Sequence, residues 1–332
     1  MLDLLTIGSA LRDIVFHTDQ TKIIETPKDL LRQRLIAVEY GAKIHSEKVA
    51  LSFGGGGLNA AVNFSRLGFK TGILCALGDD ALASELLRHM RTHRVDPRFV
   101  QRVRHQPSVF SFVLVDAPSH EHAAFVRYGS LTHLRWKFTN PPARWIYLTS
   151  LVGSQTREVI AGIDAWAKKG KVQWAWNPGG QQLREGRRGL RAVLKHVTVL
   201  NINEDEALEL ILSDSESARQ YKSLSRRTPA WKFLAQTLQI WGPKMVLLTR
   251  GAKGAVVAEE KKMTTIGTQS VKRVDTTGAG DCYGSSFIAG LIHFSGDVPR
   301  ALALADAQTS FLLQHIGAHE GLKTFQQLKN KL

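Results

Sequence analysis

Short apolar segments of strand length alternate with amphipathic helical segments along this chain of 332 residues. Strands that alternate with helices are joined by crossover connections, so that neighbouring strands run parallel and helices cover both faces of their sheet. The sequence therefore predicts an α/β fold with a doubly wound, mostly parallel sheet, built as a single domain over residues 1–332. The clearest strand candidates are residues 4–7, 145–150, 172–176, 197–202 and 245–249.

Two segments depart from this alternation. Residues 14–52 lack helical periodicity over most of their length and contain short β-like runs, and residues 105–130 show the polar and apolar alternation of a hairpin. Such patterns are typical of short strands rather than of a crossover helix. We interpret both segments as insertions that leave the main sheet and form a small β-sheet lid.

Residues 274–284, VDTTGAGDCYG, lead directly into an apolar helical run. The small residues Gly278, Ala279 and Gly280 let backbone N–H groups turn toward an anion, and the helix N-terminus adds roughly half a positive charge. A phosphoryl group in transfer would be stabilised there. Asp281 stands at the rim of this loop and is suited to act as general base for an acceptor hydroxyl. The alternative is that Gly280 and Asp281 form only a turn and a helix cap.

A second glycine-rich segment, residues 54–57, precedes Asn59 and a helix that ends at Gly68. Consecutive glycines allow close approach of a ligand, and the Asn59 amide can both donate to and accept from sugar hydroxyls. Asp13 follows the first strand, where α/β sheets bind ligands, and its carboxylate could accept two vicinal hydroxyls. Taken singly, the glycine run is also compatible with a flexible turn, and Asp13 with a turn aspartate.

The two glycine-rich segments together resemble the two signatures of ribokinase-like (PfkB-type) carbohydrate kinases, in the expected order. The resemblance covers nearly the whole chain and implies ATP-dependent phosphorylation of a hydroxymethyl group on a sugar or sugar-like substrate. It implies that Asp281 is the base and that residues 278–280 stabilise developing charge. The implied acceptor-binding residues are Asp13, Gly54, Gly55, Asn59 and Thr149.

The resemblance also implies a nucleotide site and metal ions. Asn203 and Glu206 have the spacing of a capping box, and in the family this pair lies near Mg²⁺, which keeps several waters and needs few protein ligands. In many members the segment after residue 301 closes over adenine and a K⁺ ion. The implied cofactor-binding residues are Asn203, Thr249, Gly251, Gly254 and Thr276, and the implied metal ligands are Glu206 and Asp275.

Two positions depart from the family pattern. Thr149 ends a strand where ribokinase has a glutamate on the sugar, so a neutral hydroxyl replaces a charged acceptor and argues against ribose as the substrate. Asp306 takes a place where asparagine is frequent, in the region that closes over adenine.

Three other functions stay open. A nucleoside kinase shares this fold, and Trp or Phe residues in the lid or near Trp174 could stack a base. A phosphosugar kinase would suit the net charge of +15, although the first strand lacks the Asn-Pro turn of those members. A non-catalytic anion- or RNA-binding protein would also explain that charge. The charges are spread along the chain, and Asp13 and Asp281 are both present. Nucleic acid is therefore a less favoured partner than a small-molecule substrate.

Several patterns concern location, partners and metals. Cys75 and Cys282 form no pair or C-x-x-C motif, which points to a reducing compartment, and no apolar run approaches the roughly 18 to 20 residues needed to span a bilayer. We therefore expect a cytoplasmic protein with no membrane partner, and the lid is a candidate homodimer surface. His89 and His93 have metal-ligand spacing on the predicted helix 81–93, but without a third ligand nearby we expect them on a solvated face.

Overall fold

The computed structural model describes residues 1–26, 34–119, 122–224, 228–260 and 262–329. Its main sheet has eight strands in the order β16-β15-β14-β13-β12-β11-β1-β6. All pairs from β6 to β14 are parallel, whereas β15 pairs antiparallel with both β14 and β16. The predicted mostly parallel sheet is thus confirmed. Its strands are β1 (Leu2–Ile7), β6 (Thr71–Leu74), β11 (Ala143–Leu148), β12 (Gln173–Trp176), β13 (Val199–Asn203), β14 (Met245–Thr249), β15 (Ala255–Glu259) and β16 (Lys262–Ile266).

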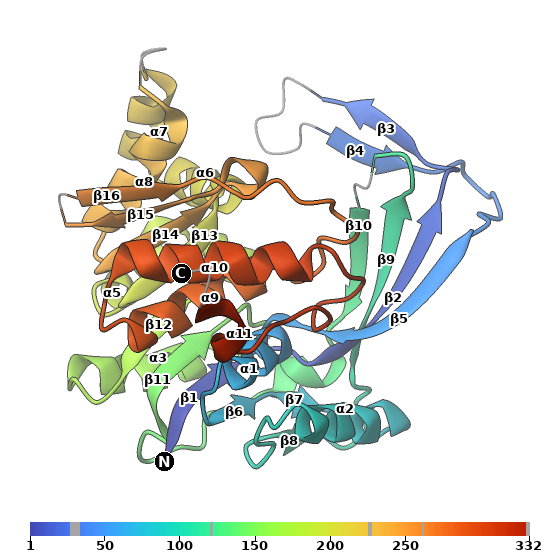
Figure 1. The fold of residues 1–332 in the computed structure, drawn as a ribbon, viewed down its shortest axis with the longest axis horizontal. Helices are drawn as coiled ribbons and strands as arrows, with labels where there is room; N and C mark the ends of the chain where they lie inside the picture. The colour runs from blue at the N-terminus through green and yellow to red at the C-terminus, as the bar shows by residue number, and fades with distance from the viewer. Residues whose placement is uncertain (27–33, 120–121, 225–227, 261, 330–332) are drawn as a thin grey trace.

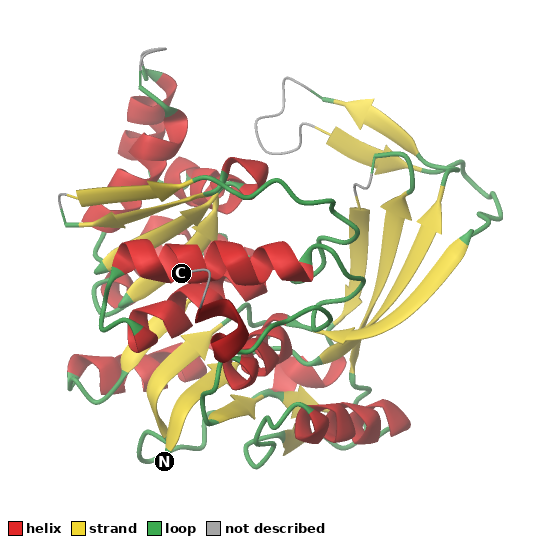
Figure 2. Cartoon of the chain, in the orientation of Figure 1, coloured by secondary structure: helices red, strands yellow, loops and turns green. Residues whose placement is uncertain are grey.

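Helices cover both faces of the main sheet (Figures 1 and 2). Successive strand residues point to opposite faces, and β11 shows the result: Ile146 and Leu148 belong to one apolar core, and Tyr147 to the other. The first core includes α3 (Thr156–Lys168), α5 (Gly186–Leu194), α6 (Glu204–Leu212) and α8 (Ala230–Ile240). The second includes α1 (Gly56–Arg66), α9 (Ala279–His293) and α10 (Val298–Leu312).

A small separate sheet stands beside the main sheet, at the right of Figure 1. Its order is β10-β9-β2-β5, with β2 (Leu11–Thr18), β5 (Lys48–Gly54), β9 (Val109–Asp116) and β10 (His122–Arg127). The predicted insertions 14–52 and 105–130 thus overlap all four strands, although β2 begins before residue 14 and β5 ends after residue 52. Residues 27–33 and 120–121 of these insertions lie outside the described residues.

The remaining elements are short or lie at the periphery. Two further pairs of strands are β3 (Lys22–Glu25) with β4 (Arg34–Ala37), and β7 (Ala76–Leu77) with β8 (Gln101–Arg102). The other helices are α2 (Ala81–Thr92), α4 (Gly180–Leu183), α7 (Ser215–Lys222) and α11 (Phe325–Leu328), with 3₁₀ turns η1 (Gly129–His133) and η2 (Gly251–Lys253). None of the helices in the described ranges is long and apolar enough to cross a membrane.

The connections of β1 and β5 bring the small sheet to the carboxyl edge of the main sheet. β1 ends at Ile7 and β2 begins at Leu11, while β5 ends at Gly54 and α1 begins at Gly56. The helices α6 and α9 also begin close to one another, because residues of both line one cavity there. Ligands of open α/β sheets bind at this edge, and both glycine-rich segments meet there.

Candidate active site

The start of α9 forms an open cradle of backbone N–H groups. Its N-cap is Gly278 with φ +73°, and a Cβ at this position would lie 2.6 Å from the Cβ of Ala318. Glycine is therefore required there for both conformation and space. A Cβ on Gly280, by contrast, would meet nothing within 4 Å. Because the first N–H groups of a helix have no partner inside the helix, this exposed turn can bind an anion.

A cavity of about 200 Å³ lies against this turn. Its lining combines the α9 start with the ends of β12, β13 and β14, which deliver side chains there because parallel strands end at the same sheet edge. Most of the residues predicted for the phosphate and metal site are therefore brought together. The lining residues are Asn177, Asn201, Ile202, Asn203, Glu206, Thr249, Thr276, Gly278, Ala279, Gly280 and Asp281.

Glu206 and Asn203 form the predicted capping box at the start of α6. The Asn203 N–H donates to Glu206 Oε2 at 3.0 Å, and the Glu206 N–H donates to Asn203 Oδ1 at 2.8 Å. Burial raises the pKa of Glu206 to about 7, the hydrogen bond from Asn203 opposes this rise, and the negative charge of Asp281 adds to it. A cation in the cavity would stabilise the ionised form of this carboxylate and lower its pKa.

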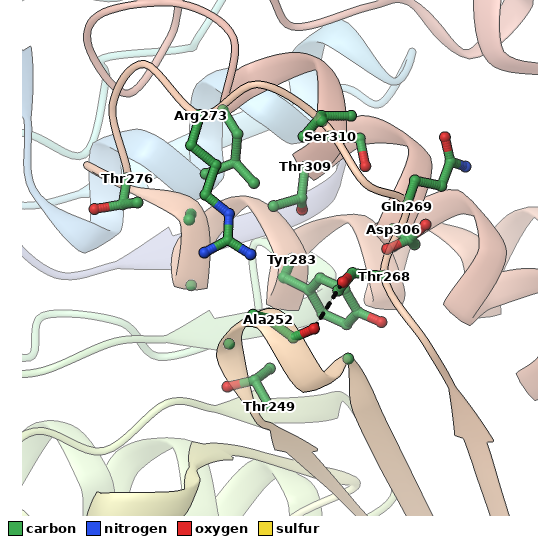
Figure 3. Close-up of a pocket in the computed structure, with 16 residues that line it drawn as sticks. Thr249, Ala252, Thr268, Gln269, Arg273, Thr276, Tyr283, Asp306, Thr309 and Ser310 are labelled. Atoms are coloured by element: carbon green, nitrogen blue, oxygen red, sulfur yellow. Dashed lines mark hydrogen bonds between the residues drawn. The ribbon is translucent and has the colours of Figure 1, made fainter.

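A second cavity has a volume of about 210 Å³, and Figure 3 shows its lining. Thr249, Thr276, Ala279 and Gly280 line both cavities, so the two spaces adjoin. The predicted nucleotide-side residues Gly251 and Gly254 lie in its wall. Other lining residues are Ala252, Thr268, Gln269, Val271, Arg273, Tyr283, Asp306, Thr309, Ser310 and Leu313.

Two side chains set the charge of this second cavity. Burial raises the pKa of Asp306, and hydrogen bonds from Gln269 oppose that rise. The guanidinium of Arg273 points into the space (Figure 3). Arg273 also lines a third cavity, of about 330 Å³, beneath the small sheet. Among the described residues that line the three cavities, it is the single arginine or lysine. The sequence reasoning missed it because nothing in the run before Asp275 marks it.

Asp13 lies on β2 with its side chain buried. The hydroxyl of Ser111 donates to Asp13 Oδ1, and Ser111 lies directly opposite it in the parallel pair of β2 and β9. A Cβ on Gly54 would lie 2.2 Å from Asp13 Oδ2, so glycine there leaves the carboxylate its place. Burial raises the pKa of Asp13, the Ser111 bond opposes that, and the charge of Asp275 adds to it. Ser111 could not be found from sequence, because only strand register brings it to Asp13.

Asn59 and the glycine loop join the acceptor side to Asp281. The Asn59 amide donates to Asp281 Oδ2 at 2.8 Å. A Cβ on Gly56 would lie 3.0 Å from Thr149 Oγ1 and 3.2 Å from Asp281 Oδ1. Burial raises the pKa of Asp281, the bond from Asn59 opposes this, and the charge of Asp13 raises the pKa further. The charge of Asp13 therefore reaches Asp281, and the two carboxylates lie near the glycine loop through Gly54 and Gly56.

Two other predicted residues have structural contacts. The Thr149 hydroxyl donates to the Ile7 carbonyl at 3.2 Å, and Gly55 has φ +97° with Ser9 O 2.7 Å from the position of a Cβ. These contacts fix the shape of the glycine loop where strands β1 and β11 end. Because Gly56 has no Cβ, the Thr149 side chain can lie against the loop.

Asp275 closes the loop that carries the cradle. Its Oδ1 accepts the N–H of Thr277 at 2.8 Å and the hydroxyl of the same residue at 2.7 Å. Its Oδ2 accepts the N–H of Gly317 at 2.8 Å. The carboxylate thereby ties residues 275–277 to the segment that follows α10.

The expectation for His89 was wrong, and Trp174 itself lies in the core. His89 does not lie on a solvated face: its ring packs against Phe53 at 4.6 Å and stacks on His319 at 5.0 Å between centroids, because the segment after α10 folds over α2. Trp174 is fully buried and stacks on Trp176 in the core, so it has no face free for a base.

The family model of pfkB carbohydrate kinases matches residues 4–324. The chain belongs to this family. It is therefore a kinase.

Individual relatives are distant but cover nearly the full chain. The ATP-dependent 6-phosphofructokinase of Thermoanaerobacterium thermosaccharolyticum is 25% identical over 307 residues, which cover 89% of each protein. The ribokinase of Cryptococcus neoformans var. grubii serotype A, solved in complex with ADP, has a TM-score of 0.78 at 22% identity over 99% of both chains. A nucleoside kinase of Burkholderia thailandensis, solved with inosine, has a TM-score of 0.77 at 16% identity, covering 99% of this chain and 97% of that one. These structures confirm the ribokinase-like fold.

Proposed function

We propose that this kinase transfers the γ-phosphoryl group of ATP to a hydroxymethyl group of a sugar or sugar-like alcohol, with Asp281 as general base. The observation that carries the proposal is the shared space at the start of α9. The charge of Asp13 acts on Asp281, and the Asn59 amide donates to Asp281 at 2.8 Å. The same turn has an open face at Gly280, where an anion can approach the backbone.

The chemistry follows from this placement. Asp13, on the rigid β2–β9 pair, accepts hydroxyls of the acceptor. A raised pKa makes Asp281 a better proton acceptor for the attacking hydroxyl than an ordinary aspartate, and its proton transfer contributes roughly 100 to 10,000-fold in rate. The N–H groups of Gly278 and Gly280 at the start of α9 stabilise charge on the transferred group, while the Ala279 N–H donates to the Thr276 carbonyl at 3.1 Å. Phosphoryl transfer needs little more from a protein than this positioning and electrostatic stabilisation.

We propose that ATP occupies the two adjoining cavities, with its phosphates toward residues 278–280 and its base toward Asp306. Mg²⁺ fits the first cavity, because the half-buried Glu206 carboxylate there has a raised pKa that a cation would lower. The ion would neutralise phosphate charge. For Asp275 we propose a loop-fixing role, since a metal ion would have to share its two oxygens with the N–H groups of Thr277 and Gly317.

The small sheet favours a sugar over a nucleoside. Asp13 and Val15 are two residues apart on β2 and so lie on the same face of the sheet. Val15 and Val113 line the cavity beneath the sheet. The aromatic residues Phe16 and Phe112, with ring centroids 4.9 Å apart, lie at the intervening positions of their strands and so on the other face. The face that closes over the acceptor therefore offers carboxylate, hydroxyl, imidazole and aliphatic groups, His17 included, which suit a polyol. The lid role proposed for residues 14–52 and 105–130 follows.

A substrate panel tests the proposal. Purified protein with ATP and Mg²⁺ is assayed for ADP release against pentoses, hexoses, sugar phosphates and nucleosides, beside the Asp281→Asn variant. We expect turnover of an unphosphorylated sugar or polyol that the variant loses. Turnover confined to nucleosides or sugar phosphates would support those rivals, and RNA binding without any phosphotransfer would refute a kinase activity.

We also propose that the outer face of the small sheet forms a homodimer contact. Leu51 and Phe125 are 65% and 63% exposed, and both lie beside the outward residues Ile14 and Phe112 through strand pairing. An apolar face of this kind on a two-sided sheet is typical of a protein interface. A second copy offers the same apolar surface in return, as a two-fold interface requires.

A further inference from the structure

A line of three hydrogen bonds runs from α2 to the proposed base. His89 Nε2 lies 2.9 Å from His319 Nδ1, and His319 Nε2 lies 2.9 Å from Asn59 Oδ1. The Asn59 amide then donates to Asp281 Oδ2 at 2.8 Å. The function proposed above uses Asp281 and Asn59, but it assigns nothing to the two histidines.

Elementary chemistry fixes the direction of every bond in this line. An ionised carboxylate only accepts, so Asn59 turns Nδ2 toward Asp281 and Oδ1 toward His319. An amide oxygen only accepts, so His319 carries its proton on Nε2. A neutral imidazole then has an acceptor at Nδ1, and His89 must donate to it from its own Nε2. All three donors therefore point toward Asp281.

The surroundings keep both rings neutral. His319 is 6% exposed. Burial lowers its pKa well below the usual value, and the charges of His89 and His93 lower it further. Burial, followed by His93, lowers the pKa of His89 to about 4. Arg66 and Glu320 act on His93 with opposite signs. Glu85, one turn before His89 on α2, is paired with Arg12. Arg12 lies over the Phe53 ring that packs on His89.

We propose that His319 is a positioning residue for the general base: its Nε2–H fixes the Asn59 amide so that Nδ2 holds Asp281 Oδ2. The other oxygen, Oδ1, faces Gly56 and remains available for the acceptor hydroxyl. The inference deepens the proposed function and rests on it. His89 supports the arrangement by holding His319 in the tautomer that donates to Asn59.

Loss of the His319 donor has a specific consequence. The Asn59 amide is then free to rotate, and in the flipped orientation its oxygen meets the carboxylate instead of its N–H. The bond from Asn59 is what opposes the burial effect on the pKa of Asp281, so its loss raises that pKa. Other groups that act on Asp281 electrostatically, or are acted on by it, are Asp13, Glu206, Tyr147 and Cys282, and they stay in place.

The test compares two substitutions at one position. His319→Leu keeps bulk but removes the donor, whereas His319→Gln keeps an N–H for Asn59 and an oxygen for His89. In full pH profiles with saturating ATP, we expect His319→Leu to lower kcat about tenfold and to move the acid limb upward by about one pH unit. We expect the KM for ATP to change less than about twofold, and His319→Gln to restore most of both changes.

His93→Leu is the matched control, because His93 packs in the same ring cluster, 5.8 Å from His319, without standing in the line of bonds. We expect its acid limb to match that of the wild type. An acid limb that moves equally in His93→Leu and His319→Leu, or not at all in His319→Leu, would overturn the inference. Wild-type turnover by Asp281→Asn would instead remove the proposed base itself, so the two failures are distinguishable.

A measurement on the unmodified protein guards against variants that fold poorly. Imidazole ¹⁵N NMR spectra of the intact protein report which ring nitrogen carries the proton. We expect the Nε2–H tautomer for His319 and His89 across pH 6 to 8. A His319 protonated on Nδ1 would overturn the inference, since Asn59 Oδ1 would then face no donor.

Discussion

Asn59 and Asp281 are 222 residues apart in the sequence and are joined by a hydrogen bond of 2.8 Å. Asn59 belongs to the first turns of α1 and Asp281 to the first turn of α9, so the two glycine-rich helix starts form one unit. A displacement of α1 would therefore move the hydrogen-bond donor of Asp281. This coupling is the reason that the catalytic predictions below depend on geometry and not only on residue type.

Asp281→Asn is expected to lower kcat at least about 100-fold, because an amide cannot take the proton of the acceptor hydroxyl. The fold and nucleotide binding should be retained, since the substitution is nearly isosteric. Calorimetric titration with ADP and steady-state kinetics check both statements. Asp19→Asn, at an exposed position of the small sheet region, is the control and should retain wild-type kinetics.

Glu206 makes stability depend on pH. Its folded pKa is raised from 4.5 to about 7, so the folded state binds the proton more tightly than the unfolded state between these values. The free energy of unfolding should therefore fall as pH rises from 4.5 to 7 and then level off. Glu206→Gln keeps the capping box and removes this dependence, gaining roughly 1 to 2 kcal/mol at pH 8 without Mg²⁺.

Urea unfolding at several pH values measures the Glu206 effect. Glu158→Gln, at an exposed position of α3 that is not among the groups acting on Glu206, serves as its control and should keep the pH dependence of the wild type. A Glu206→Gln curve parallel to the wild-type curve would show that Glu206 does not carry the effect.

Arg273→Ala is expected to raise the KM for ATP roughly 10 to 100-fold with a smaller change in acceptor KM, because a hydrogen bond to a charged group contributes about 1.5 to 3 kcal/mol. Arg273 is the single arginine or lysine among the described residues that line the three cavities. Lys272→Ala removes a neighbouring exposed charge and should leave the KM for ATP near its wild-type value. Equal effects of the two variants would point to general electrostatics instead of a direct contact.

Gly278→Ala and Gly280→Ala should separate folding from phosphate binding. Gly278 has φ +73° and little space for a Cβ, so its variant should lose about 2 kcal/mol or more of stability. Gly280 has open space, so its variant should unfold at nearly the wild-type temperature while its methyl group weakens binding at the cradle. Thermal unfolding and ATP kinetics on both variants check this. Normal kinetics for Gly280→Ala would argue against phosphates at this turn.

Phe125→Lys and Leu51→Lys should shift a dimer toward monomer, because each places a charge in the apolar outer face of the small sheet. Light scattering after size-exclusion chromatography at several concentrations measures the mass. Ile240→Lys is the control: Ile240 is 78% exposed on α8, away from the small sheet, and its substitution should leave the mass unchanged. A wild-type monomer at all concentrations would rule out this interface.

Patterns that depend on near neighbours could be predicted from the sequence. The alternation of strands and helices, the small separate sheet and the capping box of Asn203 and Glu206 follow from periodicity and from contacts three or four residues apart. The glycine at 278 could also be anticipated, since a tight turn before a helix favours positive φ. These features depend on residues close together in the sequence, and the structure has them as predicted.

Only the tertiary structure decided which distant groups meet. Ser111 reaches Asp13 through the register of β2 and β9, and His319 reaches both Asn59 and His89 because the segment after α10 packs over α1 and α2. The burial of His89 and Trp174 was missed for the same reason. Register and packing depend on the whole chain at once, so a local pattern of polar and apolar residues cannot specify them.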